Sequence, residues 1–264
     1  FCFQAFCDGT TPAAYPDITY GFYKVFAKLY SVESKVIPLK SDFSVDPQDY
    51  MGIDSTVFLA NPNAPTGMAL SLEDIEKIAL SNPDNVIIID EAYVDFGGIS
   101  AVELTRKLPN LLVVQTFSKS RSLAGGRIGF AIGSEELIDD LRKIKYSFNP
   151  YNVGALPQAA AAAAILDREY FDRNTAEIIA VREYTVEQLQ AMGIAVLPSC
   201  ANFIFVNPTR ISGQEYFAAL REKGVLVRHF TAPRVCDFVR VTIGSREQMD
   251  AYLKATREIL EERA

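Results

Sequence analysis

The sequence predicts an α/β protein, with a mostly parallel sheet that carries helices on both faces, followed by a smaller α+β domain. Strand and helix signals alternate along the first part of the chain, and strands such as 86–89 are near-continuous apolar runs, typical of strands buried on both faces. After residue 193 shorter strand signals alternate with helices that open on capping motifs. The 264 residues suffice for one or two domains, and we expect a large domain over 1–165 and a smaller one over 166–264.

Each element of the first part has a local signal. Ser71 and Asp74 form a capping pair that opens a helix. The run 159–164 is apolar but far shorter than a membrane span, so we expect a tightly packed helix. Residues 1–7 read as the end of a buried helix. Further helices are expected at 21–32, 71–80, 134–145 and 156–166, and strands at 34–39, 56–60, 86–89, 111–116 and 128–132.

The second part begins with a long amphipathic helix over 170–192, which we expect to end at Gly193 because glycine is a common helix stop. Two later helices open on the spacing of a capping box, Ser212 with Glu215 and Ser245 with Gln248. The remaining expected elements are helices at 212–223 and 245–262 and strands at 195–197, 203–206, 225–227 and 238–243.

The composition narrows the class of protein. The net charge is −7 and there is no basic run, so nucleic acid and anionic membranes are not expected partners. The four cysteines are scattered and lack metal-type spacing, which favours free buried thiols in a reducing cytoplasm over disulfides. The single histidine, His229, cannot by itself build a metal site or a Ser-His-Asp triad. Base chemistry therefore falls to another group, and Lys119 is the available candidate.

A lysine at the mouth of a buried strand is the most informative feature. Lys119 follows the apolar run 111–114 and the hydroxyl residues Thr116 and Ser118, and Arg127 follows after two glycines. Partly desolvated there, the lysine amine would be a nucleophile. The hydroxyls, glycines and arginine would suit a phosphate. A lysine beside a phosphate site favours pyridoxal 5′-phosphate (PLP), although most lysines are simply solvated.

Two further segments fit this chemistry. The strand 86–89 ends in Asp90, and Tyr93 follows. PLP needs a carboxylate that keeps its pyridine nitrogen protonated and a donor to its ring oxygen, and Asp90 and Tyr93 suit these tasks. The alternative is that Asp90 caps a turn and Tyr93 packs in the core. The segment 61–67 is a Pro- and Gly-rich turn after the strand 56–60, at the end of the sheet where open α/β folds bind ligands.

Together these motifs resemble one family. The chain is similar to the fold-type I, class II PLP-dependent aminotransferases, and among them to the histidinol-phosphate aminotransferases. The resemblance runs from the first residues to the last helix, and its motifs are residues 15–23, 65–67, 90–93, 116–129 and 227–230. It implies PLP as cofactor and transfer of an amino group between histidinol phosphate and 2-oxoglutarate in histidine biosynthesis. It also implies a cytoplasmic homodimer.

The resemblance implies roles for the cofactor-binding residues. Lys119 would form a Schiff base with PLP and then shuttle a proton, Asp90 would pair with the pyridine nitrogen, and Tyr93 would donate to the ring oxygen. Ser118 and Arg127 would hold the phosphate, with Thr116 as a weaker candidate.

The resemblance also implies roles for residues in the two turns expected beside the PLP ring. Tyr20 would stack on the ring, whereas Tyr23 is expected to pack in a helix. Many relatives have asparagine just before the Pro-Thr-Gly turn, where this chain has Ala64. We expect the adjacent Asn63 to take over its contact, or Tyr93 to act unaided.

Two late arginines are candidates for the substrate's anionic end. Arg228 and Arg240 end or interrupt apolar strands, and a guanidinium in such a place pairs bidentately with phosphate or carboxylate. The alternative is a salt bridge to a nearby acid. Asn202 is expected to order the backbone near the substrate.

Three rival functions stay open. An aromatic amino-acid aminotransferase needs the same residues, and a threonine-phosphate decarboxylase would release CO2 without an amino acceptor. The third is a non-catalytic fragment, because the chain starts at Phe1 in what reads as a helix cut in its middle. Relatives have a further stretch there, which supplies a turn for the cofactor phosphate and an arm to a partner subunit. Visible absorbance of bound cofactor would distinguish a functional site from the empty site of a non-catalytic fragment.

Overall fold

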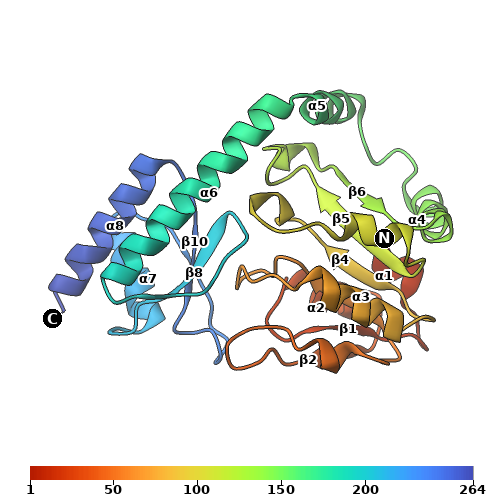
Figure 1. The fold of residues 1–264 in the computed structure, drawn as a ribbon, viewed down its shortest axis with the longest axis horizontal. Helices are drawn as coiled ribbons and strands as arrows, with labels where there is room; N and C mark the ends of the chain where they lie inside the picture. The colour runs from red at the N-terminus through yellow and green to blue at the C-terminus, as the bar shows by residue number, and fades with distance from the viewer. Residues whose placement is uncertain (264) are drawn as a thin grey trace.

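The computed structural model describes residues 1–263 and contains two β-sheets flanked by helices (Figure 1). The first sheet has six strands in the order β2-β1-β3-β4-β5-β6. Neighbouring strands are parallel except for β5 with β6, which confirms the predicted mostly parallel sheet. The strands are β1 Ala13–Pro16, β2 Ser34–Ile37, β3 Thr56–Ala60, β4 Ile87–Asp90, β5 Leu111–Thr116 and β6 Gly129–Ile132.

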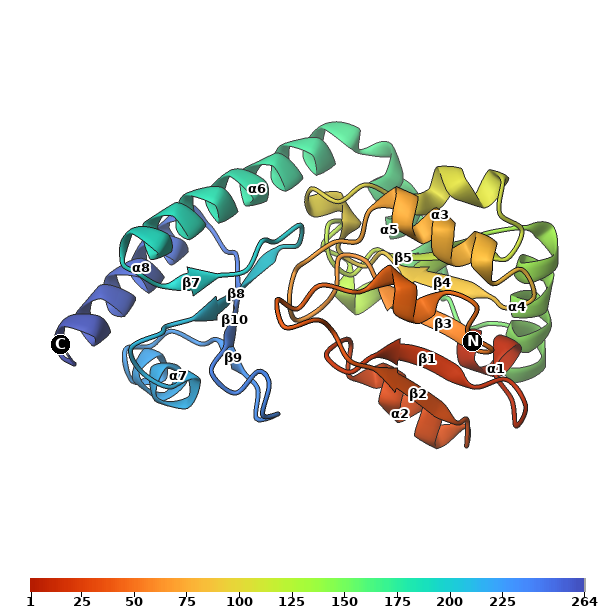
Figure 2. The same cartoon turned by 60° about the horizontal axis from the view of Figure 1, so that its bottom comes forward.

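Helices cover both faces of this sheet, as the unbroken apolar strands predicted. Along β4, Ile87 and Ile89 face one layer and Ile88 faces the other, and all three are at most 2% exposed. Burying each such side chain contributes about 1.5–3 kcal/mol. One layer is formed by α1 Cys2–Phe6, α2 Phe22–Leu29 and α4 Glu135–Phe148, and the other by α3 Leu72–Ser81 with two short 3₁₀ segments (Figure 2).

The second sheet is antiparallel, with strands in the order β7-β8-β10-β9. Along β8, Ile204 and Val206 point towards the helices, whereas Phe203 and Phe205 point towards the first sheet and its loops. The strands are β7 Ala195–Val196, β8 Phe203–Asn207, β9 Arg228–His229 and β10 Val239–Thr242. Their helices are α6 Arg168–Ala191, α7 Gly213–Glu222 and α8 Arg246–Glu261.

Several expectations are wrong in detail. The outer strands β2 and β6 are partly exposed because each has a neighbour on one side only. Helix α5 Ala155–Leu166 is not tightly packed, since Ala161 is its one buried residue. The strand expected at 225–227 begins instead at Arg228, and β1 was not predicted as a strand.

Two observations bear on the environment of the chain. No helix among residues 1–263 is both long and apolar enough to cross a membrane. All four cysteines are free thiols, of which Cys7 is buried and the others are partly buried.

Candidate active site

A cavity of about 370 Å³ opens where β3, β4 and β5 end. Parallel strands bring the loops that follow them to one edge of the sheet, the place where open α/β sheets bind ligands. Seven of the side chains singled out in the sequence line this cavity although they are far apart along the chain. They are Tyr20, Asp90, Tyr93, Thr116, Ser118, Lys119 and Arg127.

Asp90, the last residue of β4, supplies a largely buried carboxyl group. The Tyr23 hydroxyl donates to Asp90 Oδ2 at 2.9 Å, and the Ala92 N–H donates to Asp90 Oδ1 at 3.2 Å. Burial raises the pKa of Asp90, while these hydrogen bonds and the nearby Lys119 ammonium lower it. Asp90 forms no ion pair with another described residue. A positively charged group in the cavity would therefore favour its ionised form.

Tyr23 is the contact that sequence reasoning missed. It is 5% exposed and lies at the start of α2, one helical turn after Tyr20, and its ring meets the Tyr20 ring edge-on at 5.6 Å. The expectation of plain helix packing is wrong, because the hydroxyl reaches the site carboxylate. The one sequence signal was the i, i+3 spacing of the two tyrosines, which places both on one side of a helix start.

Lys119 lies in the loop after β5, at the mouth of the cavity. Its side chain is exposed, so the expected partial desolvation is wrong for the chain as described. The amine lies 5.2 Å from the centre of the Tyr93 ring. Tyr93 in turn packs edge-on against Phe203 of the second sheet, with ring centres 4.9 Å apart. The amine and the phenol therefore lie together on one side of the cavity.

The loop after β5 gathers hydroxyl and guanidinium groups. Thr116 Oγ1 donates to Ser118 Oγ at 3.0 Å and accepts the Ser118 N–H at 3.1 Å. Arg127 has a left-handed backbone with φ 53°, and its Nη1 donates to the Ala124 carbonyl at 3.0 Å. A non-glycine residue in this region costs about 1–2 kcal/mol, which the loop must offset to present the guanidinium.

Asn63 is placed differently from the expectation. It is 3% exposed and does not line the cavity, which Pro62 and Ala64 border instead. Its amide nitrogen donates to the Ile18 carbonyl at 2.9 Å, and its amide oxygen accepts from Thr19 Oγ1 at 2.7 Å. The geometry therefore gives Asn63 the task of fixing the loop that carries Tyr20, rather than a direct contact with a cofactor.

A second cavity, of about 440 Å³, adjoins the first and shares Tyr20 and Ala64 with it. Arg228 and Arg240 both line it, because they are register partners on the antiparallel strands β9 and β10. The Arg240 guanidinium lies 4.9 Å from the centre of the Phe203 ring, and its Nε is buried without a hydrogen-bond partner. Neither arginine pairs with an acid among residues 1–263, so the salt-bridge alternative finds no support.

Asn202 lies directly before β8 and lines neither cavity. Its backbone carbonyl accepts the Ile243 N–H at 2.9 Å. Asn202 is absent from the lining of both cavities, and its expected role in ordering the backbone near the substrate stays a prediction.

The chemistry of the two cavities fits PLP and an anionic substrate. Four cations border them, and none forms an ion pair with another described residue: Lys119, Arg127, Arg228 and Arg240. The buried Asp90 carboxylate suits a pyridine nitrogen, the amine suits an aldehyde, and the hydroxyl and guanidinium groups suit a phosphate. In a chain of net charge −7, such a concentration of unpaired cations indicates an anion site.

The chain is similar to known aminotransferases. The family model for aminotransferase class I and II matches residues 1–255. A histidinol-phosphate aminotransferase of Brachyspira hyodysenteriae is 48% identical over 261 residues, 98% of this chain and 74% of that protein. One from a Marinomonas species is 46% identical over 260 residues, 97% of this chain and 74% of that protein. The crystal structure of histidinol-phosphate aminotransferase from Sinorhizobium meliloti in complex with pyridoxal-5′-phosphate has a TM-score of 0.87 and 22% identity, over 99% of this chain and 73% of that one.

Proposed function

The chain belongs to the class I and II aminotransferase family, and from that premise we propose that it transfers an amino group between histidinol phosphate and 2-oxoglutarate with PLP as cofactor. The observation that carries the proposal is the pairing of two adjoining cavities. One holds an amine and a largely buried carboxylate, and the other holds two guanidinium groups that pair with no acid among residues 1–263.

The residues around the first cavity divide the cofactor's needs between them. When bound, PLP supplies an aldehyde that condenses with amines and a protonated ring that withdraws electrons from the substrate carbon. Asp90 would hold the ring nitrogen and keep it protonated, and Tyr93 would donate to the ring oxygen. Tyr20 would stack on the ring, and Ser118, Arg127 and the weaker candidate Thr116 would hold the phosphate.

Lys119 is the group that moves protons in this proposal. Its Nζ would hold the cofactor covalently between turnovers and then carry a proton between the substrate carbon and the cofactor carbon. The chain has a single histidine, His229, whose Nε2 lies 2.8 Å from the Cys236 carbonyl, outside both cavities. The exposure of Lys119 at the cavity mouth gives its flexible side chain access to a bound substrate.

The arginine pair accounts for the choice of substrates. The same site must accept the phosphate of histidinol phosphate and, in the second half of the reaction, a carboxylate of 2-oxoglutarate. The planar guanidinium fork of Arg228 and Arg240 suits both anions. Asn202 supports this end of the site through its backbone contact with Ile243.

We also propose how the chain is organised. Residues 1–165 would form a large PLP-binding domain and 166–264 a smaller one. We propose a cytoplasmic homodimer, since apolar side chains such as Tyr151, Leu156 and Leu166 are 81–92% exposed along one segment. The free thiols suit a reducing compartment.

A comparison of amino donors tests the proposed function. With PLP and 2-oxoglutarate supplied, kcat/KM for histidinol phosphate should exceed that for histidinol by about ten- to a hundredfold, because one charge-assisted contact contributes about 1.5–3 kcal/mol. Faster turnover of phenylalanine would instead indicate an aromatic aminotransferase, and CO2 release from threonine phosphate a decarboxylase. A chain that develops no visible absorbance with PLP would be a non-catalytic fragment.

A further inference from the structure

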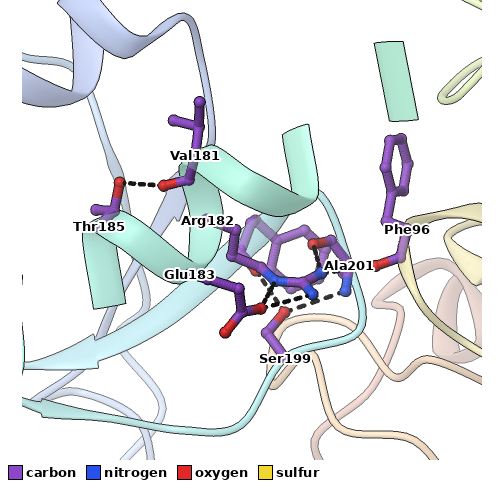
Figure 3. Close-up of polar contacts among 8 residues, drawn as sticks. Phe96, Val181, Arg182, Glu183, Thr185, Ser199 and Ala201 are labelled. Atoms are coloured by element: carbon purple, nitrogen blue, oxygen red, sulfur yellow. Dashed lines mark hydrogen bonds and ion pairs between the residues drawn. The ribbon is translucent and has the colours of Figure 1, made fainter. Parts of the chain in front are cut away.

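A buried arginine lies between the two sheets, outside both cavities. Arg182, on α6, is 5% exposed, and Figure 3 shows its guanidinium directed between the loop that ends at Phe96 and the segment that contains Ala201. Its Nη1 donates to the Phe96 carbonyl at 2.7 Å and to the Ala201 carbonyl at 2.9 Å. Its Nε and Nη2 donate to Glu183 Oε1 at 3.0 and 2.9 Å.

The two carbonyl groups belong to the segments that carry Tyr93, which lines the first cavity, and Phe203, which packs against Tyr93. Phe96 lies three residues after Tyr93, and Ala201 lies two residues before Phe203. The Phe203 ring lines neither cavity itself but contacts a lining residue of each, because it packs edge-on against Tyr93 and its centre lies 4.9 Å from the Arg240 guanidinium. Arg182 therefore binds the backbones on both sides of the Tyr93–Phe203 contact.

The same segment is fixed a second time from the first sheet. The Cys200 N–H donates to the Gly67 carbonyl at 2.8 Å, and Ser199 Oγ donates to the Phe203 carbonyl at 2.6 Å. The first contact holds the segment before β8 against the Pro-Thr-Gly turn, and the second ties that segment to the start of β8. They act on the backbone next to Phe203, as Arg182 does.

Burial of the Arg182 guanidinium has an unfavourable desolvation free energy, which a purely structural contact would not need. Burying a guanidinium costs several kcal/mol, and its one acid partner, Glu183, is 64% exposed and so remains well solvated. An apolar side chain would fill the space without that cost. Nη1 alone binds the two carbonyls, while Nε and Nη2 hold Glu183 and so fix the orientation of the planar guanidinium. This fixes the separation of the two carbonyls more tightly than packing alone.

We propose that Arg182 is a positioning residue that sets the place of Phe203, and through it of the Arg240 guanidinium, relative to Tyr93 and the lysine cavity. This rests on the proposed function, since it takes the arginine pair as the site for the substrate's anion. The two cavities hold the two ends of one substrate, so their spacing decides how well an anionic donor reaches Lys119.

Anion binding tests the proposal apart from turnover. The probe is inorganic phosphate, titrated calorimetrically into the PLP-loaded protein. R182M should weaken phosphate binding by about tenfold, and R240M by about ten- to a hundredfold, as expected for loss of a charge-assisted contact. In R182M/R240M the two effects should not multiply, because both act through one guanidinium.

Two further variants separate positioning from stability. T256V removes a buried hydroxyl that hydrogen-bonds to Tyr216 in the core beneath the second sheet, away from the cavities. This variant should lower the melting temperature but leave phosphate affinity unchanged. R182K keeps the charge but cannot span both carbonyls and Glu183, and it should bind phosphate as weakly as R182M. If R182M does not fold, the phosphate affinity of R182K tests the positioning role in its place.

The outcomes are distinguishable. Multiplicative effects in R182M/R240M, or parent-like phosphate binding by R182K, would overturn the positioning role. If the parent binds phosphate but transfers no amino group from histidinol phosphate, the proposed function fails while the cycle with phosphate still decides the role of Arg182. A higher KM for histidinol phosphate in R182M, with kcat for histidinol unchanged, would support both the positioning role of Arg182 and the proposed function.

Discussion

Asp90 is a largely buried acid that forms no ion pair with another residue of the range 1–263. Burial raises its pKa, and the Tyr23 hydroxyl is the largest influence in the opposite direction. A protonated pyridine nitrogen would supply the missing positive charge, and the carboxylate would in return keep that nitrogen protonated. The two groups therefore stabilise each other's charged forms.

Asp90→Asn keeps the size of the side chain and removes this charge. We expect the variant to bind PLP but to lose activity by about a hundred- to a thousandfold, as is usual when an electrostatic partner of the reacting centre is removed. Cofactor absorbance and steady-state kinetics measure the two effects separately. Near-normal rates would show that Asp90 only caps the turn at Ala92.

Tyr23→Phe should shift the pH dependence. Loss of its hydrogen bond removes an influence that lowers the pKa of Asp90, so that pKa rises further and the carboxyl group protonates at a higher pH. The acid limb of the pH–activity profile should then move to higher pH, because a hydrogen bond to the ionised form is lost.

Tyr15→Phe is the matched control for this shift. Tyr15 is 4% exposed and its hydroxyl donates to Ser34 Oγ at 2.8 Å, so the variant loses a buried hydroxyl that does not reach Asp90. Equal shifts in the two variants would mean that the effect is general.

The residue types at the strand ends were predictable, but their contacts were not. An amine, an acid and hydroxyls that follow apolar runs identify themselves in a sequence, and the structure places them around one cavity. The bond from Tyr23 to Asp90 and those from Arg182 to Phe96 and Ala201 join segments that only tertiary packing brings together. No local sequence pattern predicts contacts of this kind.

At the scale of elements, apolar runs located the central strands within one residue at each end, for example β3 and β5. A strand that is buried on both faces has a continuous apolar sequence. The edge strand β2, in contrast, alternates between partly buried and exposed residues. Strand β9 has two residues, too few to carry a pattern, and its position depends on pairing with β10.

The turn at Gly67 should not tolerate a side chain. Gly67 has φ +82°, and an added Cβ would lie 2.5 Å from Ser199 Oγ and 2.8 Å from Ser199 Cβ. Gly67→Ala therefore adds a steric clash to the cost of a left-handed alanine, and should lower the free energy of unfolding by about 2–4 kcal/mol, measured with urea.

Gly52→Ala isolates the backbone cost, because Gly52 has φ +61° and open space around its would-be Cβ. It should lose only about 1–2 kcal/mol. Equal losses at the two glycines would show that the contact between Gly67 and Ser199 contributes nothing.

At the scale of the whole molecule, the apolar surface along residues 151–166 is the feature that packing within one chain leaves unexplained. Tyr151, Leu156 and Leu166 are 92%, 85% and 81% exposed. An alanine-rich sequence predicted a tightly packed helix, but composition alone does not say whether the packing partner lies in the same chain. We propose that the partner is a second copy.

Light scattering should therefore give twice the 29.2 kDa chain mass at micromolar concentration. L156E, which places a charge on the exposed face of α5, should shift the protein towards the monomer because a buried charge opposes association. A parent protein that is already monomeric at this concentration would refute the homodimer.

The central claim is that Lys119 is the covalent anchor of PLP, at the mouth of a cavity that also holds Asp90 and Tyr93. Reducing the PLP-loaded protein with borohydride fixes the cofactor to whichever amine it occupies, and peptide mass mapping then identifies that residue. We expect the pyridoxyl group on Lys119 alone, and Lys119→Ala should carry none and show almost no turnover. A label on any other lysine, or an unlabelled protein that still transfers amino groups, would contradict the account.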